Sequence, residues 1–290
     1  MNSVLSETNG SFLIGDLIKG PAPIAIGKIG HTEFRTIYFN KFNTDIRPNR
    51  DLIFTNCGVF PNTHASIMKF LDVMYESLPL MDVLPVHAKI EGFIESYNLP
   101  KVPKDYENNL ILKYSPNCKL VKLRSLEPYY FNNPWSQNLA GKKVLVVSPF
   151  IESINKQYSN RNKIWDDSRI LPEFELIGLH HQFSPSLTGF SEFKDWNQMV
   201  NSMKDKISKI DFDIALIGTG ASSIPLAAHC KLIGKKAIHM GGSLQILFGI
   251  KGARWNDHLI GKNFYKDSWI FPSILETPKL YKENEKGCYW

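Results

Sequence analysis

The sequence contains no paired cysteines and no long apolar run, and each absence removes a class of protein. Its four cysteines, Cys57, Cys118, Cys230 and Cys288, are scattered and form no CxxC pair. This spacing disfavours a disulfide framework or a zinc site and favours reduced thiols in a reducing compartment. No apolar run approaches the ~20 residues that cross a bilayer, and the first residues lack the basic and apolar regions of a secretion signal. We therefore expect a cytoplasmic protein.

The chain also lacks a concentration of charge of either sign. Its 290 residues include 34 Lys and Arg against 28 Asp and Glu, a net charge of +6. Because the lysines are dispersed and form no basic arm, nucleic acid is not an expected partner. A phosphate-bearing small molecule or an anionic membrane surface suits this charge equally well.

Strands and helices alternate most clearly between residues 211 and 255. The apolar run 214–217 has strand length, and apolar residues at helical spacing follow over 223–232. A second strand over 236–240 leads into an apolar helix over 244–250. Alternation of this kind predicts a parallel sheet, because right-handed crossover helices return the chain to the same edge. We expect an α/β fold, with a Rossmann-like, mostly parallel sheet flanked by helices.

We divide the chain into three parts. Residues 1–22 are expected to form an N-terminal lead, frayed or disordered over its first half. Residues 23–262 are expected to form a single α/β domain. This domain could have two lobes, 23–135 and 136–262. Residues 263–290 are expected to be a C-terminal extension.

Both strands of the 211–255 region end in glycine turns. The first turn, Gly218-Thr219-Gly220, continues into Ala221, and the second is Gly241-Gly242-Ser243. Ligands of parallel sheets bind at the carboxyl ends of the strands. Glycines there let a ligand approach the backbone, and each turn opens a helix whose N-terminus favours anions. Gln245, Arg254 and Trp255 would add a polar group, a cation and a stacking plane, although a surface ion pair for Arg254 and a core position for Trp255 are alternatives.

The first turn does not match the dinucleotide fingerprint G-x-G-x-x-G. Ser223 occupies the third glycine position, and no acid follows about twenty residues on, where His239 and Met240 stand. A nicotinamide-dependent oxidoreductase is therefore disfavoured. Neither turn ends in G-K-[ST], which excludes a P-loop.

Another candidate region follows the strand expected over 23–30. Gly30-His31-Thr32-Glu33 stands at a strand-to-helix junction, and Arg35 follows in the helix. Glu33 there either complements the helix dipole or faces a ligand. Ser148 ends a four-residue apolar strand in the middle of the chain, and the helix after it leads to two cations, Lys156 and Arg161.

Three segments carry a resemblance to a known family: GKIGHTEF, VVSPFIESINKQ, and DIALIGTGASSIPLA continued by KKAIHMGGSLQILFGIKGARW. They resemble proteins of surface-polysaccharide gene clusters and, more remotely, the GT-D type glycosyltransferases. The resemblance spans residues 23–255, and the last segment is its most specific part. GT-D enzymes have Gly-Asp-Gly-Glu at the N-terminal junction, where the Asp and Glu serve the metal and the nucleotide-sugar diphosphate. Here Glu33 matches the Glu, His31 replaces the Asp and Thr32 replaces the second glycine.

The resemblance implies Mn²⁺ or Mg²⁺ as a cofactor, with Glu33 as a ligand. His31 can ligate a transition ion but is a poor partner for Mg²⁺, which prefers oxygen. If no metal takes part, cations must balance the diphosphate charge, and Lys156, Arg161 and Arg254 are the candidates.

These features predict a glycosyltransferase that moves a sugar from a nucleotide-diphosphate sugar to a glycan or glycolipid acceptor in polysaccharide biosynthesis. Glu33 would act as general base or metal ligand, assisted by His31. The other residues expected to bind substrate are Gly30, Arg35, Ser148, Lys156, Arg161, Gly218, Thr219, Gly220, Ala221, Gly241, Gly242, Ser243, Gln245 and Arg254.

The alternative is a non-catalytic protein of a polysaccharide-assembly complex that binds a glycan or a partner. His31 in place of the Asp favours it. Peripheral membrane association and a homodimer are compatible with both functions. The enzyme hypothesis requires Glu33 to face both glycine turns across one cleft.

Overall fold

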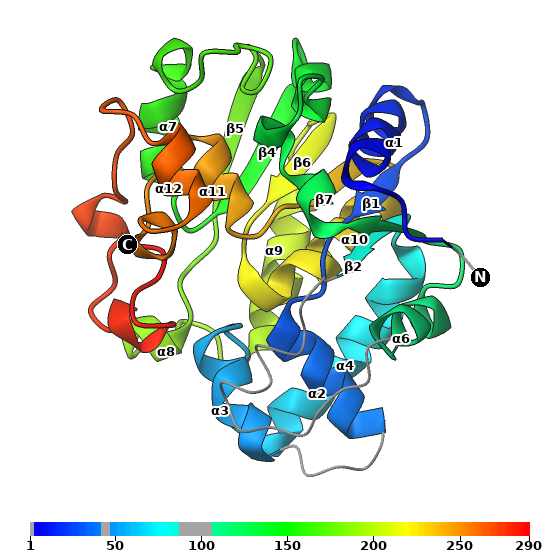
Figure 1. Ribbon diagram of the computed structural model, residues 1–290. Helices are drawn as coiled ribbons and strands as arrows, with labels where there is room; N and C mark the ends of the chain where they lie inside the picture. The colour runs from blue at the N-terminus through cyan, green and yellow to red at the C-terminus, as the bar shows by residue number, and fades with distance from the viewer. Residues whose placement is uncertain (1–2, 42–46, 87–105) are drawn as a thin grey trace.

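A seven-stranded parallel sheet forms the centre of the computed structural model, which describes residues 3–41, 47–86 and 106–290 (Figure 1). The strand order is β3-β2-β1-β7-β6-β4-β5, and every paired strand is parallel. The fold is therefore α/β and Rossmann-like, as the sequence predicts. The strands are β1 (Ile24–Ile26), β2 (Val83–Val86), β3 (Lys119–Lys122), β4 (Lys143–Ser148), β5 (Glu175–His180), β6 (Ile214–Ile217) and β7 (Lys236–His239).

The central strands are apolar along their length because helices cover both faces of the sheet. In β4, Val144 and Val146 face one core, whereas Leu145 and Val147 face the other. All four side chains are fully buried. A continuous apolar run in the sequence thus becomes a strand buried on both sides.

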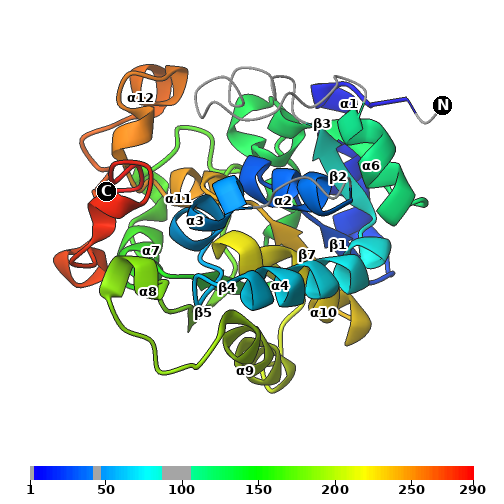
Figure 2. The same ribbon diagram turned by 90° about the horizontal axis from the view of Figure 1, so that it is seen from below.

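The helices form two layers. One layer consists of α2 (His31–Lys41), α3 (Arg47–Thr55), α4 (His64–Ser77), α6 (Tyr106–Tyr114), α9 (Trp196–Ser208) and α10 (Ser223–Leu232), and Figure 2 shows part of it from below. The other consists of α1 (Glu7–Lys19), α7 (Ile151–Tyr158), α11 (Ser243–Leu247) and α12 (Leu259–Phe264). The short α8 (Pro185–Thr188) lies beside the C-terminal segment, where the N–H of Leu280 donates to the carbonyl of Leu187. Within the described ranges, no helix has the length and apolar character needed to cross a membrane.

The connections from the adjacent strands β4 and β6 leave in opposite directions. β4 continues through α7 to the outer strand β5, whereas β6 continues through α10 to β7, toward the middle of the sheet. Neighbouring strands whose connections diverge leave a crevice at their carboxyl ends. The topology therefore puts this crevice at the edge where both glycine turns lie.

The N-terminal residues form a helix instead of the expected frayed lead. The Ser6 hydroxyl caps α1 by accepting a hydrogen bond of 3.2 Å from the N–H of Asn9. Ile14 and Ile18 of α1 are buried in the same core as α7. A Cβ on Gly10 would lie 2.8 Å from the Cβ of Ser125, so α1 packs closely against the domain. The helical spacing of the apolar residues Ile14 and Ile18 is a signal for this helix that the sequence interpretation did not use.

The C-terminal residues are also part of the domain, not an extension of it. The buried carboxylate of Glu276 accepts hydrogen bonds from the N–H groups of Glu152 (2.7 Å) and Ser153 (3.2 Å) and from the Ser153 hydroxyl. These N–H groups belong to the first turn of α7 and have no partner within the helix. The indole N–H of Trp290 donates to the carbonyl of Glu276 at 2.7 Å. The carboxylate thus anchors the C-terminal segment at η8 (Ile274–Glu276) to the helix that follows β4.

We expect Glu276→Ala to destabilise the protein by about 2 to 3 kcal/mol, because it leaves buried N–H and hydroxyl donors unpaired. Urea unfolding followed by circular dichroism measures the change. Glu283→Ala, which removes an exposed carboxylate from the same segment, serves as the control. Equal unfolding midpoints for the two variants would show that Glu276 does not anchor the segment.

Candidate functional site

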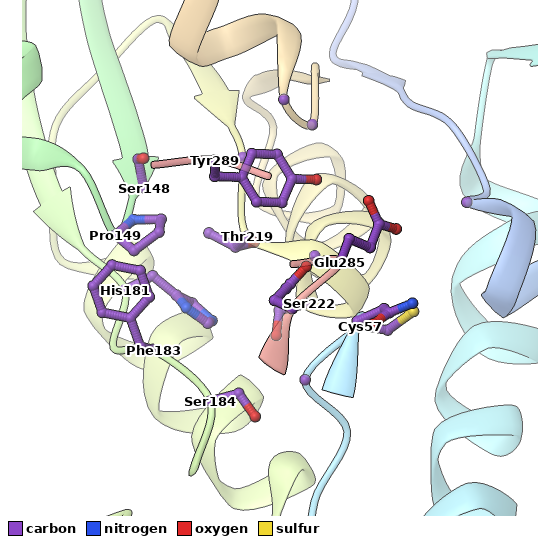
Figure 3. Close-up of a pocket in the computed structure, with 18 of the residues that line it drawn as sticks. Cys57, Ser148, Pro149, His181, Phe183, Ser184, Thr219, Ser222, Glu285 and Tyr289 are labelled. Atoms are coloured by element: carbon purple, nitrogen blue, oxygen red, sulfur yellow. The ribbon is translucent and has the colours of Figure 1, made fainter. Parts of the chain in front are cut away.

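A cavity of about 740 Å³ opens at the carboxyl ends of the strands. Residues that follow β1, β4, β5, β6 and β7 line it, together with the C-terminal segment (Figure 3). Its volume lies within the roughly 300 to 1,000 Å³ of small-molecule sites. Glycine turns, charged groups and aromatic rings form different parts of the wall.

The two glycine turns lie against each other. A Cβ on Gly218 would stand 2.9 Å from Leu244 Cδ2 and 3.1 Å from the carbonyl oxygen of Gly241. Gly220 has a φ of +58°, and a Cβ there would stand 2.9 Å from the carbonyl oxygen of Cys57. Glycine is therefore required at both positions by close backbone approach.

Lys28 is the deepest of three cations on the cavity, the others being Arg254 and Lys286. It follows β1, and its Nζ would lie 2.9 Å from a Cβ on Gly241, so it reaches the second glycine turn. Burial lowers the pKa of Lys28, and the positive charge of Arg254 lowers it further. The carboxylate of Glu127 has the opposite effect and raises this pKa. Lys28 forms no ion pair with any residue that the structure describes. An anionic ligand would relieve the cost of this desolvated ammonium group.

Arg254 lies nearer the rim, with 38% of its side chain exposed. Its Nη2 lies 3.5 Å from the Glu285 carboxylate, and its guanidinium lies 5.1 Å from the ring centroid of Tyr289. Glu285 and Lys286 both have left-handed backbone, with φ of 44° and 60°. Such conformations are costly for non-glycine residues and cluster at functional sites. This turn brings Glu285 to the cavity (Figure 3).

Glu33 lines the cavity and also stays close to the N-terminus of its own helix. Its carboxylate folds back over Gly30, so that a Cβ on Gly30 would overlap it. Burial raises the pKa of Cys57, and the charge of Glu33 and its hydrogen bond with the thiol raise it further. The two interpretations of Glu33 are therefore compatible: it lies at the positive end of α2 and at the cavity.

Three aromatic rings form the wall next to β4 and β5. The rings of Phe150, Phe183 and Trp290 have pairwise centroid distances of 5.7 to 5.8 Å and all line the cavity. His181 is directed from this side toward Ser222 (Figure 3). Rings in this arrangement offer apolar surface to a sugar or a base.

Two buried acceptors on the cavity lack partners among the described residues. Burial lowers the pKa of His181 to about 4, so its ring is neutral at pH 7, and its Nε2 has no hydrogen bond. The Nε2 of Gln245 donates to the carbonyls of Lys251 (2.9 Å) and Tyr289 (2.8 Å), which identifies its Oε1 as the unpaired acceptor. Unpaired buried acceptors call for an explanation, and a ligand with hydroxyl or N–H donors supplies one.

The structure brings most of the predicted site residues to this one cavity, so Glu33 and both glycine turns share it. The predicted residues on the cavity are Gly30, His31, Glu33, Ser148, Gly218, Thr219, Gly220, Gly241, Gly242, Gln245 and Arg254. Their roles in binding or catalysis stay predictions.

Two of the predicted cations lie elsewhere. α7 starts at the carboxyl edge of the sheet and runs away from it, so Lys156 near its end is exposed to solvent outside the cavity. Arg161 follows the helix and pairs with Glu173 at 2.6 Å, in a separate groove. Neither cation can balance charge in the cavity, because the helix carries both to the opposite edge.

Three further predicted residues are buried beside the cavity without lining it. The guanidinium of Arg35 lies 5.7 Å from the Phe39 ring within α2. The N–H of Ala221 donates to the carbonyl of Cys57 at 3.0 Å, and the hydroxyl of Ser243 donates to the carbonyl of Met240 at 2.5 Å. Ala221 and Ser243 support the turns through these hydrogen bonds, and none of the three residues lines the cavity.

Sequence reasoning overlooked several residues of the cavity. Lys28 has a signal, since it stands between the end of a strand and the Gly30 junction. His181 also has a signal, since it directly follows a strand. Glu285, Tyr289 and Trp290 have no local signal, because a fold of the last thirty residues brings them to the sheet.

The divalent cation that the resemblance implies is not matched by the donor groups. Across residues 3–41, 47–86 and 106–290, no three His, Cys, Asp or Glu side chains converge on a common point as a metal site would require. Glu33 supplies one carboxylate, and its neighbour Cys57 is a thiol whose pKa is raised. The described residues at the cavity therefore do not fit a divalent metal site.

We expect the neutral, buried His181 and His239 to make the protein less stable as the pH falls. Burial lowers the pKa of His181 to about 4 and, together with the charge of Lys28, that of His239 to about 3. The unfolded chain takes up these protons below pH 6.5 and the folded chain does not, so stability is complete above this pH and declines below it. Each histidine costs about 2 kcal/mol at pH 5.

Urea unfolding at pH 7 and pH 5 measures this loss. His181→Gln should lose less stability between the two pH values than the wild type, whereas His64→Gln, at an exposed site, should match the wild type. Identical losses for all three proteins would contradict a buried neutral His181.

Comparisons of the chain with family models, with curated proteins and with solved structures return no match. The geometry of the cavity therefore carries the functional argument. Its main features are three cations, two glycine turns and an aromatic wall around one cavity.

Proposed function

We propose that the protein is a glycosyltransferase that binds a nucleotide-diphosphate sugar in this cavity and transfers the sugar to a glycan or glycolipid acceptor. The observation that supports this most is Lys28, which has no ion-pair partner among the described residues and lines one cavity with both glycine turns and Arg254. Desolvated cations beside open backbone turns suit a diphosphate. The resemblance to GT-D type enzymes at Glu33 points to the same chemistry.

In this proposal the diphosphate lies between Lys28, Arg254 and the two turns. Lys28 gains a counter-charge when the ligand binds, and it stabilises the negative charge that develops on the leaving diphosphate. Glu285 limits the freedom of Arg254 before the ligand arrives, since the two form an ion pair at 3.5 Å. The N-termini of the helices that open at the turns add partial positive charge.

The uncharged ring of the donor, sugar or base, lies along the aromatic wall. Phe150, Phe183 and Trp290 provide apolar contact, and the Nε2 of His181 and the Oε1 of Gln245 accept hydrogen bonds from its hydroxyl or N–H groups. Ser148 accepts from the N–H of Phe150 at 3.1 Å, which leaves its own hydroxyl proton to donate to the ligand. Such a division between charged and apolar walls suits a nucleotide sugar.

In the transfer step, Glu33 accepts the proton of the acceptor hydroxyl. As this oxygen attacks the anomeric carbon, the bond from that carbon to the diphosphate oxygen breaks, and the diphosphate leaves with both bonding electrons. Glu33 takes the proton as general base, and His31 lies on the same cavity beside it. Lys28 and Arg254 compensate the charge on the leaving group.

Isothermal titration with a panel of nucleoside diphosphates and nucleotide sugars, with and without Mn²⁺, tests binding. We expect one or more to bind the wild type and Lys28→Met to weaken that binding by about ten-fold or more, because a charge-assisted contact is lost. Arg161→Met is the matched control: it removes a cation outside the cavity and should leave the affinity unchanged. A folded wild-type protein that binds none of the panel would refute the proposal.

Release of nucleoside diphosphate from the bound donor measures turnover, by transfer or by hydrolysis. Glu33→Gln should retain donor binding within a few-fold and lower turnover by about 100-fold or more, because it removes the base but keeps the shape of the side chain. Unchanged turnover in this variant would remove Glu33 from the mechanism.

A non-catalytic glycan- or partner-binding protein is the second candidate. The histidine at position 31, where GT-D enzymes have an aspartate, favours it, as does the incomplete set of metal donors within the described residues. A wild-type protein that binds donor or glycan without turnover would support this candidate against the enzyme.

A further inference from the structure

The C-terminal segment exposes an apolar tip to solvent. Ile274 and Leu275, in the short helix η8 (Ile274–Glu276), are 88% and 82% exposed, and Phe271 is 51% exposed. Single exposed apolar side chains are common, but adjacent and almost fully exposed ones indicate an interaction surface. Five of the nine large hydrophobic side chains exposed in the described residues lie between Leu259 and Leu280.

The tip is held firmly despite its exposure. Glu276, the residue after Leu275, is buried and bound to the first turn of α7. Ser273 on the other side forms a capping box with Glu276, and its N–H donates to the Ser153 hydroxyl at 3.0 Å. The structure therefore presents Ile274 and Leu275 outward from a fixed backbone.

Basic side chains accompany the apolar ones. The Nζ of Lys251 lies 6.0 Å from the ring centroid of Phe271. Lys279, Lys282 and Lys286 are exposed along the same segment, against one exposed carboxylate, Glu283, between residues 271 and 290. Apolar side chains next to lysines suit a surface with an apolar interior and anionic groups on its outside.

We propose that Phe271, Ile274 and Leu275 insert into the interfacial region of an anionic lipid bilayer, while Lys279 and Lys282 contact phospholipid head groups. Insertion removes the aliphatic side chains from water, and the head-group charge attracts the lysines. This docking does not rest on the proposed function.

Docking of the tip would also position the cavity relative to the membrane. The same segment supplies Glu285, Lys286, Tyr289 and Trp290 to the cavity wall, so docking would hold the cavity close to the membrane surface. If the proposed transferase activity is correct, this position suits an acceptor linked to a lipid.

Flotation of the full chain with vesicles tests the proposal. One set contains phosphatidylcholine alone, and the other contains phosphatidylcholine with phosphatidylglycerol. We expect binding to the anionic vesicles that weakens as salt is added. The double variant Ile274→Ser/Leu275→Ser should lower the partition coefficient by about ten-fold or more, since two aliphatic side chains no longer leave water.

The matched control is Leu232→Ser/Ile233→Ser, which changes another adjacent pair of exposed aliphatic residues, at the end of α10. It should bind the anionic vesicles like the wild type. Lys279→Glu/Lys282→Glu should weaken binding to anionic vesicles and remove most of its salt dependence. Circular dichroism and urea unfolding confirm that each variant is folded.

Absence of wild-type binding to anionic vesicles, or equal losses in the tip variant and the Leu232 control, would overturn the proposal. A wild type that sediments as a dimer, does not bind vesicles and becomes a monomer in the tip variant would also overturn it, because a second copy then covers the tip. Nucleotide titration is independent of these results: vesicle binding without nucleotide binding would refute the transferase and leave the docking intact.

Discussion

The contact between the Glu276 carboxylate and the first turn of α7 is the constraint on which the site depends. In folds of this class the helix N-terminus after a central strand is a ready anion site. Here the chain fills that site with its own buried carboxylate. The anchored segment then continues to Glu285, Tyr289 and Trp290, which close one side of the cavity. One buried carboxylate thus occupies the helix N-terminus after β4 and anchors the segment that lines the cavity next to β6 and β7.

Charge is distributed unevenly within the cavity. Lys28 is the deep cation without an ion-pair partner among the described residues, whereas Arg254 at the rim already pairs with Glu285. Burial lowers the pKa of Lys28, and only an anion or a nearby carboxylate restores it. Because His181 and His239 are neutral at pH 7, they add no competing positive charge. This arrangement favours an anionic ligand at the β1 and β7 side and an uncharged group at the aromatic side.

The sequence was sufficient for the parallel sheet and for the two glycine turns, because apolar runs and glycines are local signals. It also placed Glu33 and Ser148 at strand ends, which a parallel sheet brings to one edge. It did not reveal how far a helix carries Lys156 and Arg161 from that edge, or that residues 284–290 return to the cavity. Those positions depend on tertiary packing, such as the contact of Glu276 with α7, which leaves no periodic pattern in the chain. The glycines at 218 and 241 were correctly expected to form turns, and their mutual contact was visible only in three dimensions.

A crystal structure of the protein soaked with a nucleoside diphosphate tests the central claim most directly, namely that this cavity holds a phosphate-bearing ligand. The account predicts phosphate oxygens within hydrogen-bond distance of the Lys28 ammonium group and next to the turns at Gly218 and Gly241, with the base or sugar along Phe150 and Trp290. A ligand bound instead in the groove at Arg161, or an empty cavity at saturating ligand, would contradict it.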